Sequence, residues 1–131
     1  MGDTVLVGAK VPDSIELIKN LDASGDRPTF AVWVFYDDTD EWRFLIAGPT
    51  FDKLLPNQRK VAYRKLVDVM AKMPYSSLSL SDLQILDTKA PIVQAVRRLV
   101  HTGPNATLHA RYSNTTLNGI FIKEMVILRA A

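Results

Sequence analysis

Four carboxylates crowd one short polar segment of the chain. Asp37, Asp38, Asp40 and Glu41 stand within five positions, between two runs rich in aromatic residues. A calcium loop needs oxygen ligands at alternating positions, a glycine at the bend and a distant glutamate. The segment has no such glycine and is too short to wrap an ion. Because aspartate tolerates turn geometry, we interpret the cluster as the solvated tip of a β-hairpin.

Asp87-Thr88-Lys89 is the second arrangement that suggests chemistry. It is similar to the carboxylate-x-lysine element that holds a divalent ion and positions water in restriction-type nucleases. Such a site also needs an aspartate from a neighbouring strand, and Asp37, Asp38 or Asp82 would serve only if the fold brought one close. Asp87 or Thr88 can equally cap the helix that follows.

Other catalytic patterns find little support. The two histidines are His101 and His109, and no glycine-flanked nucleophile elbow surrounds the nearby Ser113. The chain has no cysteine, which removes thiolate metal ligands and a cysteine nucleophile. No glycine-rich phosphate loop is present. We therefore expect no catalytic residue, no metal site and no cofactor, and we favour a non-enzymatic function.

The composition is that of an ordinary globular protein. The chain has 131 residues, of which 47% are hydrophobic and 23% charged, which suits one domain with a sizeable core. No basic residue precedes the apolar run at the N-terminus, so a secretory signal is not predicted. No stretch approaches the roughly 20 apolar residues of a membrane span. We expect a soluble, cytoplasmic protein that does not act at a membrane.

The first half of the chain predicts a helix followed by a hairpin. Residues 11–26 indicate a short helix that Asp13 or Ser14 caps and Gly25 ends. Residues 28–37 and 41–49 are β-branched and aromatic on both faces. Strands of this kind lie centrally in a sheet and are covered on both sides.

A long amphipathic helix is predicted over residues 51–74, with Pro56 near its start. Its apolar stripe is formed by residues at helical spacing, which are Ala62, Leu66, Val69 and Met73. Val61 and Met70 are predicted to lie beside this stripe. The remaining arc carries Arg59, Lys60, Arg64, Lys65 and Lys72.

The second half predicts a strand, a helix and a second hairpin. Residues 83–87 indicate a short strand, and residues 88–103 a helix whose inner face includes Ile92, Val96, Leu99 and Val100. Residues 106–113 and 118–129 indicate two strands joined by the segment 114–119, which contains the turn-forming pair Asn118-Gly119.

These elements predict a single α+β domain over residues 1–131. The order α-β-β-α-β-α-β-β favours one mixed, mainly antiparallel sheet of about five strands with helices packed on it. We expect residues 1–11 to form a flexible or loosely attached N-terminal segment.

The net charge of +2 is unevenly distributed along the sequence. Residues 1–51 carry −5, residues 52–88 carry +2 and residues 89–131 carry +5. Phosphate neutralisation would support nucleic-acid binding if the cations of the two later helices shared one face of the sheet with Arg111. Those helix residues are Arg59, Lys60, Arg64 and Lys65, then Arg97, Arg98 and His101.

Four phrases of the sequence carry a resemblance: AVWVFYDDTDEWRFLIAGP, VAYRKL, SLSDLQILDTKAPIVQAVRRLVHTG and ARYSNTTLNGIFIKEMVILR. Together they resemble a group of small bacterial proteins without an assigned activity, over roughly residues 14–129. The resemblance implies a shared fold and no functional residue. It is carried by Trp33, Trp42, Arg43, Pro49, Tyr63, Arg64, Thr102, Gly103, Arg111, Ser113, Asn114, Asn118 and Gly119.

One leading hypothesis and two alternatives follow. We expect a non-enzymatic protein-interaction or accessory, regulatory module of a bacterial cytoplasmic system, with a protein partner or self-association steered by charge. The first alternative is a nucleic-acid-binding protein that uses a basic helical face, and the second is a metal-dependent nuclease. The predicted binding residues are Arg43, Tyr63, Arg64, Arg97, Arg98, Arg111 and Asn114.

Overall fold

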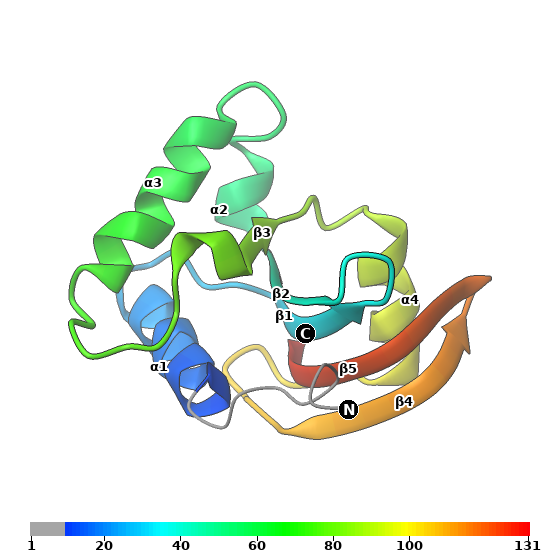
Figure 1. Cartoon of the computed structure of the whole chain (residues 1–131). Helices are drawn as coiled ribbons and strands as arrows, with labels where there is room; N and C mark the ends of the chain where they lie inside the picture. The colour runs from blue at the N-terminus through cyan, green and yellow to red at the C-terminus, as the bar shows by residue number, and fades with distance from the viewer. Residues whose placement is uncertain (1–9) are drawn as a thin grey trace.

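One mixed sheet with helices on both faces forms the described part of the protein (Figure 1). The computed structural model describes residues 10–131. The elements are α1 (Lys10–Ala23), β1 (Phe30–Tyr36), β2 (Glu41–Ala47), α2 (Pro49–Asp52), α3 (Arg59–Met70), the 3-10 turn η2 (Leu80–Asp82), β3 (Leu83–Ile85), α4 (Pro91–Leu99), β4 (Ala110–Leu117) and β5 (Ile120–Ala130). The predicted α+β class is confirmed.

The strands are arranged in the order β3-β2-β1-β5-β4. Neighbouring strands are antiparallel except β2 and β3, which run parallel. Antiparallel neighbours can be joined by a tight turn, whereas a parallel pair needs a longer crossover. Here α2, α3 and η2 form that crossover between β2 and β3.

Both faces of the central hairpin are buried, as its sequence predicts. On one face, Trp33 stacks on Phe44 with ring centroids 5.0 Å apart, and α1, α2 and α3 cover them. On the other face, Val32 and Leu45 pack with Val93 of α4. Burial of this much aromatic and branched surface is the main favourable contribution to folding.

Two predicted helix starts are wrong, because tertiary contacts use the residues that were expected to cap them. α1 already includes Lys10, and Asp13 instead accepts hydrogen bonds from Ser77. Ser14 is buried within α1, where its Oγ accepts a 2.7 Å hydrogen bond from Nε1 of Trp33.

Neither Asp87 nor Thr88 caps α4. This helix begins at Pro91, and its N-cap residue Ala90 makes no side-chain capping bond. Oδ1 of Asp87 accepts a 2.7 Å hydrogen bond from the amide of Lys89, and the amide of Thr88 donates a 2.9 Å hydrogen bond to Asp52.

The helix predicted over residues 51–74 is two helices, α2 and α3. Pro56 lies between them. Proline lacks an amide donor and its ring clashes with the preceding turn, so a continuous helix cannot run through this position. The predicted apolar stripe is confirmed for Ala62, Leu66 and Val69, which are buried.

The second hairpin differs from its prediction in length. β4 runs from Ala110 to Leu117, so the segment predicted as a turn, 114–119, is mostly strand. Asn118 and Gly119 alone make the turn, with φ of 49° and 79°. Asn114 has a left-handed φ of 49° within β4, and the strand pairing continues on either side of it, Ser113 with Glu124 and Thr115 with Ile122.

The predicted loosely attached segment 1–11 falls mainly on residues 1–9, which lie outside the described residues. Lys10 and Val11 belong to α1, and Nζ of Lys10 forms a 3.0 Å ion pair with Asp82. Within residues 10–131, no helix has both the length and the apolarity to cross a lipid bilayer.

A buried ion pair joins the end of β5 to α1. Arg129 is fully buried and forms a two-pronged pair with Asp22, Nη1 to Oδ1 at 2.8 Å and Nη2 to Oδ2 at 2.9 Å. Its guanidinium also donates to the carbonyl oxygens of Ala106 and Pro28, at 2.8 and 3.0 Å. All these contacts satisfy a charge that would otherwise be costly to bury.

We expect Asp22→Asn to lower the free energy of unfolding by about 3 kcal/mol, because it leaves the buried guanidinium without its counter-charge. The measurement is urea unfolding followed by tryptophan fluorescence. Asp68→Asn, on the exposed side of α3, is the matched control and should change stability little. Equal effects of the two substitutions would contradict this account of Arg129.

Candidate interaction surface on α3

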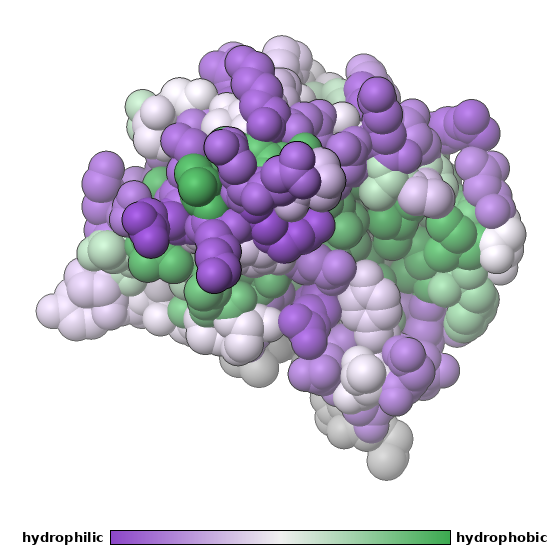
Figure 2. All heavy atoms as spheres, turned by 90° about the horizontal axis from the view of Figure 1, so that it is seen from above, coloured by the Kyte–Doolittle hydropathy of each residue, from purple (hydrophilic) through white to green (hydrophobic). Residues whose placement is uncertain are grey.

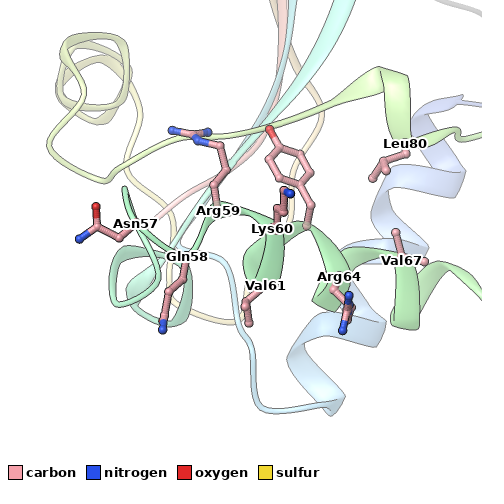
Figure 3. A pocket seen from close by; sticks show the side chains of 9 residues that line it. Asn57, Gln58, Arg59, Lys60, Val61, Arg64, Val67 and Leu80 are labelled. Atoms are coloured by element: carbon pink, nitrogen blue, oxygen red, sulfur yellow. The ribbon is translucent and has the colours of Figure 1, made fainter.

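An open groove of about 880 Å³ runs along the outer side of α3 (Figure 3). In this view Asn57 lies at one end of the groove, and Val67 and Leu80 lie at the other. Leu80 comes from η2, and the other lining residues come from α3 and the two residues before it. The lining consists of Asn57, Gln58, Arg59, Lys60, Val61, Tyr63, Arg64, Val67 and Leu80.

Three aliphatic side chains in this groove are unusually exposed. Val61, Val67 and Leu80 have 45%, 44% and 43% of their surface open to solvent. The prediction that Val61 lies beside the buried stripe is wrong, because the sheet-facing residues of α3 point the other way. Val61 and Val67 each lie three positions from the exposed Arg64, so they flank it on the outer side of the helix. Exposed apolar side chains gathered in one groove are typical of a contact surface.

The groove is positively charged as well as apolar. Arg59, Lys60 and Arg64 line it, and no carboxylate is among the described lining residues. Within residues 10–131, neither Lys60 nor Arg64 forms an ion pair. Figure 2 shows the side of the molecule that carries α3 as small hydrophobic areas set among hydrophilic side chains.

Two side chains of α3 fix the helix against the edge of the sheet. The hydroxyl of Tyr63 accepts a 3.0 Å hydrogen bond from the amide of Ile85. Nη1 of Arg59 donates a 3.3 Å hydrogen bond to the carbonyl oxygen of Ile85. The neighbouring amide of Leu86 donates instead to Ile46 of β2. α3 therefore occupies the side of β3 that faces away from β2, which holds the groove at a fixed place. Tyr63, a predicted binding residue, has this structural role.

The η2 wall of the groove is held by a polar network. Ser79 and Asp82 form a reciprocal capping box, and Asp82 also pairs with Lys10. Nη1 of Arg43, a predicted binding residue, donates to the carbonyl oxygen of Ser81 at 3.1 Å. Arg43 thus supports the segment that presents Leu80.

The other predicted binding residues lie elsewhere. α4, with Arg97 and Arg98, covers the opposite face of the sheet from α3, so the cations of the two helices do not form one patch. Arg111 on β4 pairs with Glu124 of β5 at 2.9 Å, and Asn114 lies further along β4.

The acidic residues are also dispersed. The tip of the first hairpin, residues 37–40, is a turn, as predicted, and Asp37 pairs with Lys123 at 3.3 Å. Asp82 is held by Lys10 and by the capping box with Ser79. No group of three or more potential metal-ligating side chains occurs in the part of the chain that the structure describes. Asp37 and Asp82, two of the three aspartates that the nuclease hypothesis could place beside Asp87, are thus engaged with other partners.

A smaller cleft of about 260 Å³ lies beside this hairpin tip and includes Tyr36, Ile92 and Phe121. Burial raises the pKa of the Tyr36 hydroxyl, with the nearby Arg43 opposing and Asp38 adding to the shift. The α3 groove, at about 880 Å³, is the larger of the two.

Sequence reasoning identified Arg43, Tyr63 and Arg64 near this surface but missed Val67 and Leu80. The interval of three between Val61, Arg64 and Val67 makes these residues neighbours on the helix, but it does not determine which face they occupy. Comparisons of the chain with family models, with curated proteins and with solved structures returned no match. The resemblance noted from the sequence therefore stays a prediction.

We expect Tyr63→Phe to lower the free energy of unfolding by about 1–2 kcal/mol, because the amide of Ile85 loses its acceptor. Amide hydrogen exchange at Ile85 should become faster than in the parent protein. Tyr75→Phe is the matched control, since Tyr75 is 98% exposed. An unchanged exchange rate at Ile85 in Tyr63→Phe would contradict the anchoring role.

A second prediction concerns the loop that leads to η2. Hydrogen bonds from the hydroxyl and amide of Ser77, each 2.7 Å long, hold the pKa of Asp13 below its usual value of 3.8. Because the folded pKa is the lower one, this stabilisation is fully present above pH 3.8 and is lost as pH falls through the folded pKa. In an NMR titration, Ser77→Ala should move the pKa of Asp13 upward, and a pKa that does not move would refute this origin of the shift.

Proposed function

We propose that this chain is a non-enzymatic protein-interaction module, of an accessory or regulatory kind, that binds its partner through the outer face of α3. The observation that carries the proposal is the exposure of Val61, Val67 and Leu80 together in one groove. Burying aliphatic surface of this kind against a partner removes it from water, which makes the free energy of association more favourable.

The rigidity of the groove supports this proposal. α3 is attached to β3 through Tyr63 and Arg59, and η2 is attached to β2 through Arg43. A surface already held in its binding geometry has less conformational entropy to lose on association. The setting that we propose is the cytoplasm of a bacterium: the resemblance is to bacterial proteins, and the lack of cysteine suits a reducing compartment.

Nucleic-acid binding is less well supported than protein binding. A single-stranded nucleic acid is bound by cations together with stacking aromatic side chains, whereas the exposed apolar residues here are aliphatic. The cations of α3 and α4 also lie on opposite faces of the sheet, so a continuous phosphate-binding face through both helices is not formed.

A photo-crosslinking residue placed at position 67 tests the proposal in cells that express the chain. We expect one adduct that is sensitive to protease and resistant to nuclease, and that is lost when Val61→Ser and Arg64→Glu are added. Position 99 is the matched control, because Leu99 is 39% exposed but lies on α4. The adducted protein is identified by mass spectrometry, purified and titrated against the chain.

Three outcomes would overturn the proposal: a nuclease-sensitive adduct, equal adducts at positions 67 and 99, or no binding between the purified proteins. The variants are made on exposed residues, so circular dichroism should show an unchanged fold.

A further inference from the structure

We infer that the partner segment in the α3 groove is an acidic amphipathic helix. This inference rests on the proposed function and specifies the chemistry of the partner. Three features of the groove lead to it: its unbalanced charge, the spacing of its exposed aliphatic side chains and the lack of free backbone groups beside it.

The charge of the groove requires an acidic partner. Arg59, Lys60 and Arg64 contribute three cations to the lining, and no described lining residue is acidic. Nζ of Lys60 and the guanidinium of Arg64 have no ion-pair partner within residues 10–131. A partner that brings carboxylates would neutralise these charges and would be guided to the surface over a distance of about one Debye length.

The spacing of the aliphatic side chains fits a short helix. Val61 and Val67 are six residues apart on α3, which corresponds to about 9 Å along the helix axis. Apolar side chains at i, i+3 or i+4, and i+7 of a partner helix span a similar distance and lie on one face. Leu80, on η2, is available beside Val67 to contact the same face (Figure 3).

The backbone around the groove favours a helix over an extended segment. An extended peptide leaves its own amides and carbonyls to be satisfied by the surface that binds it. At Ile85 the nearest strand offers no partner, because its amide and carbonyl are already bonded to Tyr63 and Arg59. A helix satisfies its backbone internally, so it can lie on aliphatic side chains without this cost.

A second copy of the chain fits the groove less well. Its exposed acidic segment, residues 37–41, is a turn and the start of β2, not a helix. In that segment Asp37 is paired with Lys123, and Glu41 lies 3.7 Å from Arg43. Self-association through the groove is therefore treated as an outcome of the test.

The probe is a fluorescein-labelled peptide of about 15 residues, with leucines at helical spacing on one face and glutamates on the flanks. Two comparison peptides replace either every glutamate by lysine or every leucine by serine. Fluorescence anisotropy with the full chain at low salt should give a Kd of about 10–100 μM for the acidic peptide, the weak range expected of a small contact surface. Binding of both comparison peptides should be at least about 10-fold weaker.

Variants of the chain locate the binding. Arg64→Glu and Val67→Ser should each raise the Kd of the acidic peptide, by roughly 10-fold and roughly 5-fold. Lys19→Glu and Leu99→Ser are the matched controls, since both residues are exposed outside the groove, and they should leave the Kd within about twofold.

Several results would overturn the inference. These are equal binding of the acidic and lysine peptides, binding that Arg64→Glu and Val67→Ser do not weaken, and light scattering that shows dimers which Val67→Ser dissociates. Displacement of the acidic peptide by single-stranded DNA with a lower Kd would overturn the proposed function as well. A groove-dependent protein adduct at position 67, without acidic-peptide binding, would refute only the acidic helical character of the partner and leave the proposed function standing.

Discussion

The first hairpin is apolar on both of its faces, and the positions of the other elements follow from the need to bury it twice. A sheet of this kind must be covered on both sides. α1, α2 and α3 cover the face with Trp33 and Phe44, and α4 covers the face with Val32 and Leu45. The same requirement separates the two cation-bearing helices, and it leaves the outer side of α3 exposed to solvent.

Charges that are far apart in the sequence are close in space. Acidic residues from the first third pair with basic residues from later parts of the chain, as in Asp22 with Arg129, Asp37 with Lys123 and Asp26 with Lys65. Part of the uneven charge of the sequence is thus balanced within the fold. The cations of the α3 groove are an example of charge that stays unbalanced.

The sequence predicted those features that depend on neighbouring residues. The alternation of bulky residues in β1 and β2, the Asn118-Gly119 turn and the buried stripe of Ala62, Leu66 and Val69 are all local patterns. The helix starts could not be predicted in the same way. Asp13 accepts a hydrogen bond from Ser77, which is 64 positions away in the sequence. Thr88 donates one to Asp52, which is 36 positions away. Tertiary bonds of this kind leave no trace in the local spacing.

The groove was only partly predictable for a related reason. A helical period of 3.6 residues assigns Val61 to the border between the inner and outer faces, and only the packing of α3 on the sheet decides between them. The role of Tyr63 depends on β3, a strand that lies 22 residues away from it at Ile85. Leu80 joins the surface through η2, whose position depends on Lys10 and Arg43.

The bonds from Tyr63 and Arg59 to Ile85 also have a consequence for the protein at high concentration. An open strand edge is a template onto which a strand from another molecule can add, and this is a common start of aggregation. At β3 that template is closed by side chains of the same molecule. At the far margin, β4, the left-handed backbone at Asn114 interrupts any straight ladder of foreign hydrogen bonds. Both margins of the sheet thus disfavour polymerisation.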